Sequence, residues 1–342
     1  MSDKKSYPTI HDPLYKKIAD RITGRIRSGE FLAGSQLPSI NAVALQYKAS
    51  RESVVAAFRY LLKEGVVASR QGKGYFVREE FLSGKKSVLV LLDKFSPHQQ
   101  TILDSFIQNV GSDVDVTIRA HYQSIDAFSA ILDKELGRYD WYLLFPHFPV
   151  DDVSQAQALL QIYRLPQERL ILIDRLFPGS PDNAGASYQS IECDIPETLA
   201  EAANDIRAFG RMRFIPLSVS LYGTLVDRVI REFCVTNDIP FESLSEIPET
   251  INRGDVFFLT GSRLDQKLVA LVKRIQAAGL SIGKDVGIIC YNDFPLNELI
   301  LGGLSTLSTD FAQMGREAAK MISEGRLSRI RGKCRLIRRN TF

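Results

Sequence analysis

Positively charged hydrogen-bond donors gather in two short stretches near the start of the 342-residue chain. The first begins at Arg51, directly after Ser50, and the second is the run 70–73, Arg-Gln-Gly-Lys. Arg and Lys donate hydrogen bonds to phosphate oxygens, and Arg also pairs with the edge of a guanine base. Gly72 has no Cβ, so its backbone can enter a narrow groove. These residue types predict contacts to DNA.

Ten residues form the candidate DNA-binding set. Arg51 stands in the first turn of a predicted helix, where a recognition helix places side chains that meet base edges. Asn41 is a neutral amide that can pair with adenine or with a phosphate. The set is Ser39, Asn41, Ser50, Arg51, Ser53, Arg59, Arg70, Gln71, Gly72 and Lys73. A solvated helix face is the alternative for its basic members, above all for Arg59 and Arg70.

Three helices and two strands must hold these side chains. Apolar residues recur every four positions in the first helix, at Leu14, Ile18, Ile22 and Ile26. A second short helix follows Ser39 and a third follows Ser50, each serine serving as an N-cap, with a tight turn at 48–49 between them. Two strands around the 69–74 loop complete a winged helix-turn-helix.

Three motifs follow one another in this region: Leu37-Pro38-Ser39, Ser50-Arg51-Glu52-Ser53-Val54 and Gly72-Lys73-Gly74-Tyr75-Phe76-Val77. By their order and spacing, residues 14–77 resemble the head of the GntR family of bacterial transcription regulators. Many relatives carry Glu-Arg after Leu-Pro-Ser, and that Arg touches DNA. This chain has Ile40-Asn41 instead, which implies a different operator preference.

Charge and length separate a head from a larger body. Residues 1–80 hold 14 Lys or Arg against 8 Asp or Glu, whereas the remainder holds 29 against 32. The predicted domains are a basic head at 1–80, a linker at 81–86 and a slightly acidic body at 87–342. The polar N-terminus and the lack of any 18-residue apolar run predict a cytoplasmic protein without a membrane span.

The cysteines and histidines predict no metal centre. Four Cys lie more than 40 residues apart in sequence, and four His are equally scattered, so neither type has metal-ligand spacing. Widely spaced cysteines are typical of reduced, buried thiols in an intracellular protein. We also expect no cofactor, since the sequence contains no nucleophile motif and no phosphate-cradling glycine loop. The chain is therefore predicted not to be an enzyme.

From Ser87 onward, short apolar runs alternate with helical patterns, which predicts βαβ units and parallel sheets covered on both faces. The expected strands are 88–92, 114–118, 141–145, 170–173, 191–193, 214–217, 256–259 and 286–290. The expected helices lie near 98–110, 124–136, 152–163, 196–209, 222–236 and 263–278. The fold class is thus α/β, with a winged helix-turn-helix followed by a two-lobed, doubly wound sensor.

Several short motifs of the body resemble landmarks of the LacI/GalR effector domain, which has a periplasmic-binding-protein-like fold. They are Leu172-Ile173-Asp174-Arg175, the segment 285–293, Leu304-Ser305-Thr306-Leu307, Met314-Gly315 and the segment 336–341. The resemblance implies chain crossovers between lobes near 187–192, 302–308 and 325–333. A GntR-type head on such a sensor is similar to the arabinose-responsive repressors. It implies a homodimeric repressor that binds a palindromic operator and responds to a sugar.

Candidate effector-binding residues follow from the rule that ligands bind beyond the carboxyl ends of parallel strands. Polar groups beside an aromatic ring suit a sugar, which offers hydroxyls and C–H faces. The candidates are Lys94, Phe95, His147, Phe148, Asp174, Arg175, Tyr222, Arg228, Asn292 and Asp293. Arg228 comes from the resemblance alone, and Val229-Ile230-Arg231 breaks the family pattern after it. Ordinary core packing is the alternative for Phe95 and Phe148, and loop capping is the alternative for Asp293.

Two other functions remain open at this level. One is a solute-binding protein without a regulatory role, which the basic head and the missing signal segment disfavour. The other is a GntR-type head fused to a pyridoxal-phosphate enzyme-like domain, which the regular βαβ rhythm disfavours.

Overall fold

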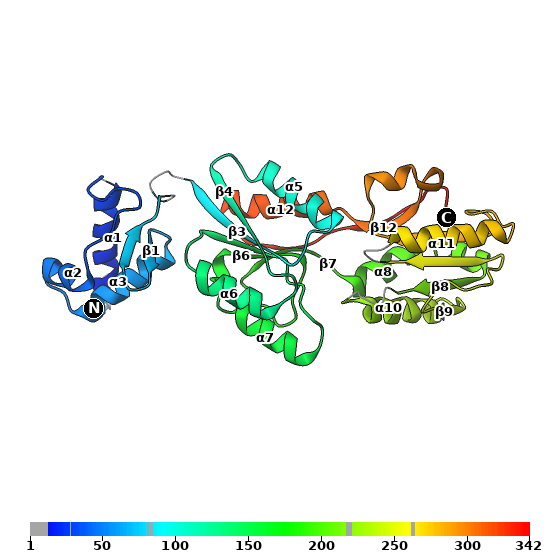
Figure 1. Cartoon of the computed structure of the whole chain (residues 1–342), viewed down its shortest axis with the longest axis horizontal. Helices are drawn as coiled ribbons and strands as arrows, with labels where there is room; N and C mark the ends of the chain where they lie inside the picture. The colour runs from blue at the N-terminus through cyan, green and yellow to red at the C-terminus, as the bar shows by residue number, and fades with distance from the viewer. Residues whose placement is uncertain (1–12, 28, 80, 82–84, 217–220, 261–263) are drawn as a thin grey trace, which may run out of the picture. The chain divides into compact units, whose positions relative to one another are not determined.

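The computed structural model describes residues 13–27, 29–79, 81, 85–216, 221–260 and 264–342. It divides into two compact units. One contains the chain up to Leu89 together with Ser112–Thr117 and Ala130–Tyr142, and the other contains the rest. The predicted α/β class, with a helical N-terminal region and two sheets behind it, is confirmed (Figure 1). Residues 82–84 of the predicted linker lie outside the described residues.

The N-terminal region contains the three predicted helices and the two-stranded wing. Its elements are α1 (Leu14–Arg27), α2 (Ile40–Tyr47), α3 (Arg51–Lys63), β1 (Val67–Arg70) and β2 (Gly74–Val77). The strands pair antiparallel, with Val67 opposite Val77 and Arg70 opposite Gly74. Lys48 ends α2 in the left-handed conformation, at φ 52°, which makes the turn into α3 tight.

One apolar core holds this region together. Ile18, Ile22 and Ile26 are buried against Phe58 and its neighbours on α3, as their spacing predicts. Leu14 differs from the prediction, since it begins α1 and is 53% exposed. Burial of one face of α3 leaves the opposite face available for contacts outside the core.

The body contains two six-stranded sheets. In sheet order, the first has β13 (Arg329–Arg331), β7 (Gly185–Gln189), β6 (Leu170–Arg175), β5 (Trp141–Leu144), β3 (Lys86–Leu92) and β4 (Val114–Ala120). The second has β14 (Cys334–Ile337), β12 (Ser305–Thr309), β11 (Gly287–Tyr291), β10 (Asp255–Leu259), β8 (Arg211–Ile215) and β9 (Phe241–Ser243). Neighbours in the second sheet run parallel except β12 and β14, which are antiparallel.

Helices connect the strands and cover both faces of the sheets (Figure 1). They are α5 (Pro97–Asn109), α6 (Ile125–Glu135), α7 (Asp152–Ile162), α8 (Ile191–Ala200), α9 (Ala203–Phe209), α10 (Gly223–Thr236), α11 (Leu264–Ala277) and α12 (Phe311–Glu324). Short 3-10 turns lie at Gln167–Arg169, Pro295–Glu298 and Ile300–Gly302. On the second sheet, α8, α9 and α10 share one core and α11 packs on another. Across the described residues, no helix is long and apolar enough to cross a membrane.

The chain passes between the two sheets three times. It leaves the first sheet after β7, returns to it through α12 after β12, and leaves again between β13 and β14. These crossings lie at 189–191, 309–311 and 331–334. The second crossing is therefore slightly later than the predicted segment 302–308.

One predicted strand is a helix start. Ile191–Cys193 was expected to be extended, but it is the first turn of α8, and the strand before it is β7. Ser190 determines the difference, because its Oγ accepts a hydrogen bond from the Cys193 amide and its own amide donates to Asp194 at 2.6 Å. A short apolar run does not distinguish a strand from a buried helical turn, whereas this capping pair does.

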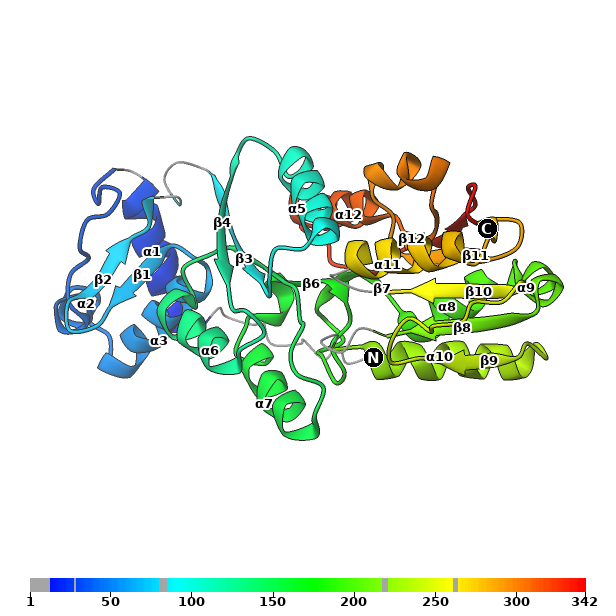
Figure 2. The same ribbon diagram turned by 45° about the vertical axis from the view of Figure 1, so that its right-hand side comes forward.

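Helices α5 and α12 pack closely because of Gly315, and they lie side by side in both views (Figures 1 and 2). A Cβ at this position would overlap the Ile102 carbonyl oxygen and lie 2.8 Å from the Phe106 amide nitrogen.

We therefore expect Gly315→Ala to lower the free energy of unfolding by about 1–3 kcal/mol, measured by urea denaturation. Gly24→Ala is the matched control. An added methyl meets nothing within 4 Å in α1, so this change is expected to raise stability by about 0.5–1 kcal/mol. Equal stability of Gly315→Ala and the parent would contradict the close packing.

Candidate DNA-binding surface and ligand cleft

Two serine caps determine where α2 and α3 begin. Ser39 Oγ accepts a hydrogen bond from the Ala42 amide at 3.2 Å. Ser50 Oγ accepts one from the Ser53 amide at 3.2 Å and lies 2.9 Å from Ser53 Oγ. Three of the ten predicted DNA-binding residues thus already have a local partner. Their placement orients the first turn of α3, from which Arg51 projects.

The exposed face of α3 carries basic side chains. Arg51 and Arg59 are both exposed, whereas Val54 and Phe58 are buried. Eight residues correspond to a rotation of about 80° around a helix, so Arg51 and Arg59 share one broad face. Asn41, in the first turn of α2, is exposed as well. The predicted base-reading residues are therefore accessible.

The wing is a tight loop with a glycine at its tip. Lys73 N donates to Arg70 O at 2.9 Å, which closes the turn. Gly72 has φ 71° and nothing lies within 4 Å of where its Cβ would be, so the tip is open. The Arg70 guanidinium lies 4.4 Å from the centre of the Phe76 ring, while Gln71 and Lys73 are exposed. The ring thus holds Arg70 at the base of the wing.

In the body, a buried carboxylate organises the carboxyl ends of several strands. Asp174 is the second-last residue of β6, stands at φ 74° and is fully buried. Its Oδ2 lies 2.9 Å from His147 Nε2 and 3.3 Å from His98 Nε2, and its Oδ1 accepts a hydrogen bond from Gln189 at 2.7 Å. A non-glycine residue in the left-handed region is strained, and such strain is common at binding sites.

The network continues from Asp174 to aromatic groups. His147 Nδ1 lies 3.0 Å from the Tyr222 hydroxyl, and the Tyr291 hydroxyl donates to Gln189 Oε1 at 3.1 Å. The Arg175 guanidinium lies 3.9 Å from the centre of the Tyr222 ring. Since the deprotonated carboxylate can only accept, His147 donates from Nε2 to Asp174.

The protonation states of this network follow from its burial and its partners. Burial alone would raise the pKa of Asp174, but the imidazoles of His98 and His147 outweigh it and hold that pKa well below its usual value. Burial raises the pKa of Tyr222 to about 12, so its hydroxyl stays protonated. The cluster therefore offers hydrogen-bonding groups of both kinds, as hydroxyl-rich ligands require.

Phe148 lies in the core and not at an open site. It is fully buried and packs against Phe128 at 5.1 Å and Phe177 at 6.0 Å between ring centres. His121 stacks on it, with ring centres 4.7 Å apart and planes 19° from parallel. Sequence alone left core packing open for Phe148, and this placement favours that alternative.

The burial of His121 predicts that the stability of the protein depends on pH. Burial lowers its pKa from 6.5 to about 4, so it stays neutral in the folded protein while the unfolded chain takes up a proton. The unfolded state then binds more protons between pH 6.5 and 4, and stability is lost as the pH falls through that window. The full effect is about 3 kcal/mol. We expect the melting temperature of His121→Phe to fall less between pH 7 and pH 4 than that of the parent, as measured by thermal unfolding. An equal loss in parent and variant would contradict this assignment.

Asn292 and Asp293 follow β11 but have different surroundings. Arg339 binds both carboxylate oxygens of Asp293 at 2.8 Å, and Thr306 Oγ1 donates to it at 2.9 Å. Burial acts to raise the pKa of Asp293, yet the Arg339 and Thr306 hydrogen bonds lower it. Asn292 stands at φ 72°, and its buried Oδ1 has no hydrogen-bond partner among the described residues. Of the two residues, Asn292 is thus the one whose side-chain oxygen can still accept a hydrogen bond from a ligand.

The three remaining candidates are exposed. Lys94 and Phe95 follow β3 and are exposed, Phe95 by 60%. Arg228 is on the outer side of α10, where it forms an exposed ion pair with Glu232 one helical turn away at 3.4 Å. The contacts of α10 therefore do not support the ligand-binding role that the resemblance suggested for Arg228.

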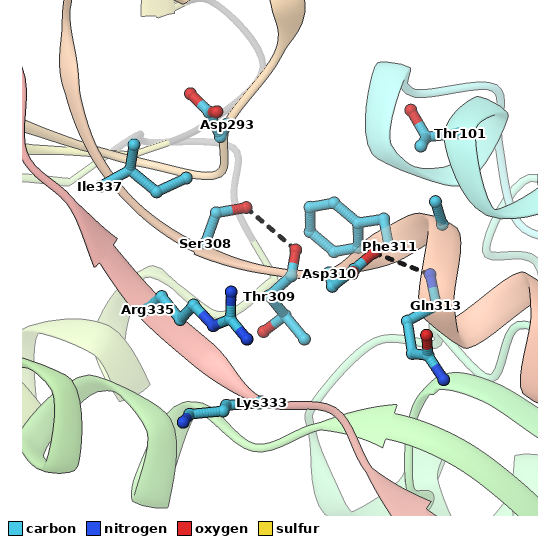
Figure 3. A pocket seen from close by; sticks show the side chains of 11 residues that line it. Thr101, Asp293, Ser308, Thr309, Asp310, Phe311, Gln313, Lys333, Arg335 and Ile337 are labelled. Carbon is cyan, nitrogen blue, oxygen red and sulfur yellow. Dashed lines mark hydrogen bonds between the residues drawn. The ribbon is translucent and has the colours of Figure 1, made fainter.

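A pocket of about 510 Å³ lies beside the second crossing. Its lining comes from Thr101, Asp293, Ser308, Thr309, Asp310, Phe311, Ala312, Gln313, Lys333, Arg335 and Ile337 (Figure 3). His98 connects it to the Asp174 network, because its ring centre is 5.2 Å from that of Phe311. Of these residues, sequence reasoning named only Asp293. The strand-end rule could have found Ser308 and Thr309, which end β12, as well as Gln189, which ends β7.

Comparison with known proteins identifies both parts of the chain. Residues 14–77 match the bacterial regulatory proteins of the gntR family, and residues 262–340 match a periplasmic binding protein-like domain. The mannosyl-D-glycerate transport/metabolism system repressor of Escherichia coli (strain K12) is 41% identical over 166 residues, which is 48% of this chain and 53% of that protein. The chain thus spans about half of that relative's length.

A second relative is matched over most of its length. The uncharacterized HTH-type transcriptional regulator YurK of Bacillus subtilis (strain 168) is 32% identical over 217 residues, covering 55% of this chain and 83% of that protein. Among solved structures, the trehalose repressor of E. coli has a TM-score of 0.57 at 14% identity, covering 74% of this chain and 100% of that one. A dimeric Lac repressor has a TM-score of 0.56 at 14% identity, covering 75% and 98%. These two show a shared fold.

The head that carries the three motifs thus matches one family, and the C-terminal part of the two-sheet body matches another. The chain belongs to the gntR family of bacterial regulatory proteins and carries a periplasmic binding protein-like domain behind its winged helix-turn-helix.

Proposed function

We propose that the chain is a transcription regulator, a repressor that binds a palindromic operator as a homodimer and releases it when a small sugar-like ligand occupies the body. The observation that carries the proposal is the presence in one chain of an exposed basic recognition helix and a buried polar network at strand ends. Such a regulator works in the cytoplasm, where its DNA is.

The head supports the DNA-binding half. Arg51 in the first turn of α3, the amide of Asn41 and the open wing tip at Gly72 are the features with which a winged helix contacts base edges and phosphates. The remaining wing donors, Gln71 and Lys73, suit the phosphate backbone. Residues 14–77 match the gntR family of bacterial regulatory proteins, and two relatives of the chain are named as a repressor and as a transcriptional regulator.

The Asp174 network supports the ligand-binding half. Asp174, His147 and Tyr222 combine acceptors, donors and an aromatic face, the combination that binds sugar hydroxyls and C–H groups. The names of the mannosyl-D-glycerate and trehalose repressors concern sugars. The fold similarity to Lac and trehalose repressors also favours a regulator over a pyridoxal-phosphate enzyme.

A buried contact offers a route from sensor to head within the first compact unit. Arg78 directly follows the wing strand β2 and its side chain is 3% exposed. It donates to Ser87 Oγ at 2.6 Å, and Asp140 lies 3.8 Å away before β5. A ligand-driven shift of β3 or β5 would therefore change the position of Arg78 at the base of the wing.

The experiment begins with the purified chain and a random duplex library, from which bound DNA is selected and sequenced. We expect enrichment of a palindrome, bound by two copies of the chain, and release of that DNA by at least one sugar or sugar derivative in anisotropy titrations. Enrichment of no sequence would overturn the DNA-binding half. A palindrome that no sugar derivative releases would overturn the ligand half and leave the DNA-binding half in place.

A further inference from the structure

The pocket beside the second crossing has an excess of unpaired positive charge. Lys333 and Arg335 line it, both are exposed, and neither makes an ion pair with any described residue. Strand register fixes Arg335 there, since it lies opposite Ser308 on the paired strands β14 and β12. Figure 3 shows its guanidinium pointing toward Thr309.

The two acidic residues of the lining already have arginine partners. Asp293 is held by both nitrogens of Arg339, each at 2.8 Å. Asp310 caps α12 by accepting a hydrogen bond from the Gln313 amide at 2.8 Å, and it lies 3.6 Å from Arg316. With both carboxylates paired, the charge left for a ligand is that of Lys333 and Arg335.

Hydroxyl groups and a helix start face the same space. Thr309 is 4% exposed, and its Oγ1 has no nitrogen or oxygen partner, only a weak interaction with the Cys334 thiol. Ser308 Oγ donates to Thr309 O at 3.1 Å. The N-terminus of the 14-residue helix α12 adds a positive partial charge, which favours an anion.

We propose that this pocket binds the anionic group of the effector, a carboxylate or a phosphate, so that the effector is an acidic sugar and not a neutral one. Arg335 pairs with the anion, Lys333 adds charge, and Thr309 Oγ1 donates a hydrogen bond to it. The proposal rests on the proposed function and extends it.

The two parts of the site adjoin at one residue. His98 contacts Asp174 at 3.3 Å and its ring lies 5.2 Å from Phe311 of the pocket. Thr101, one turn further along α5, lines the pocket itself. A ligand that spans His98 would place its hydroxyls at the Asp174 network and its anion beside Arg335.

The test compares matched ligands by isothermal titration calorimetry on the full chain. The probes are neutral aldohexoses, their 6-phosphates, the corresponding uronic and aldonic acids, and inorganic phosphate. We expect at least one sugar phosphate or sugar acid to bind at least tenfold more tightly than its neutral parent. The affinities for the 6-phosphate and for the sugar acid are then compared, and the tighter of the two shows whether the pocket prefers a phosphate or a carboxylate.

Two variants assign the anion to the pocket. Arg335→Ala is expected to weaken the acidic ligand at least tenfold, whereas Arg228→Ala, which removes an exposed arginine of α10, is expected to leave it unchanged. Arg335→Lys is expected to retain part of the affinity. Unaltered binding by Arg335→Ala, equal affinity for neutral and acidic partners, or no binding of any acidic probe would overturn the proposal. Release of operator DNA by a neutral sugar would do so too, while leaving the proposed regulatory function intact.

Discussion

Arg51→Ala will weaken binding of the selected operator by roughly 5- to 150-fold, corresponding to a loss of about 1–3 kcal/mol for one base-edge contact. Arg51 is exposed in the first turn of α3, directly after the Ser50 cap, where side chains of a recognition helix reach the major groove. Fluorescence anisotropy of a labelled duplex at fixed salt measures the change, since affinity for DNA depends steeply on salt.

Specificity separates this role from a general charge effect. If Arg51 reads a base, Arg51→Ala loses discrimination between the operator and a scrambled duplex. Lys17→Ala is the matched control, because Lys17 is an exposed cation on α1 of the same head. A loss no larger than that of Lys17→Ala would rule out base reading by Arg51. The fold of the variant is checked by circular dichroism.

The second large effect is expected at Arg78. Its side chain is almost fully buried beside Asp140, and both the amide and the hydroxyl of Ser87 donate to Asp140 at 2.8 Å. Arg78→Ala removes the cation and leaves the Asp140 carboxylate without it. Breaking a buried pair in this way costs about 3–5 kcal/mol, and the 29% exposure of Asp140 places the expectation at the lower end.

A double-mutant cycle tests whether the two residues act together. Arg78→Ala, Asp140→Ala and the double variant are compared by urea unfolding. We expect the double variant to lose clearly less than the sum of the single changes, because removing one partner already forfeits the interaction. Additive losses would mean that Arg78 acts through packing alone. Operator release by ligand in Arg78→Ala then reports whether this contact also transmits the signal.

Local patterns predicted the head well, and physical reasons explain why. The serine caps, the apolar spacing of α1 and the glycine wing act over a few residues, so the sequence reveals them. The predicted strand at 191–193 was wrong, because Ile191 and Cys193 alternate with Glu192 as in a strand, and only the Ser190 and Asp194 pair marks a helix start.

The candidate site was harder to predict, since it depends on long-range placement. The strand-end rule named Asp174 and His147, which the structure joins at 2.9 Å. It missed His98, which lies in the first turn of α5, and Arg335, which reaches the pocket only because β14 pairs with β12. Phe148 was named by position, yet local packing gives it neighbours on every side.

The three crossings between sheets bear on the order in which the chain folds during synthesis. Strand β13 pairs with β7, with Arg329 beside Ala186, and β14 pairs with β12 at the edge of the other sheet. Neither sheet is complete until residues 329–337 have left the ribosome, whereas the apolar core of the head comes entirely from the segment between Tyr15 and Phe81. Domains generally fold as they emerge, so a nascent chain would possess a finished DNA-binding head before it has a sensor to restrain it.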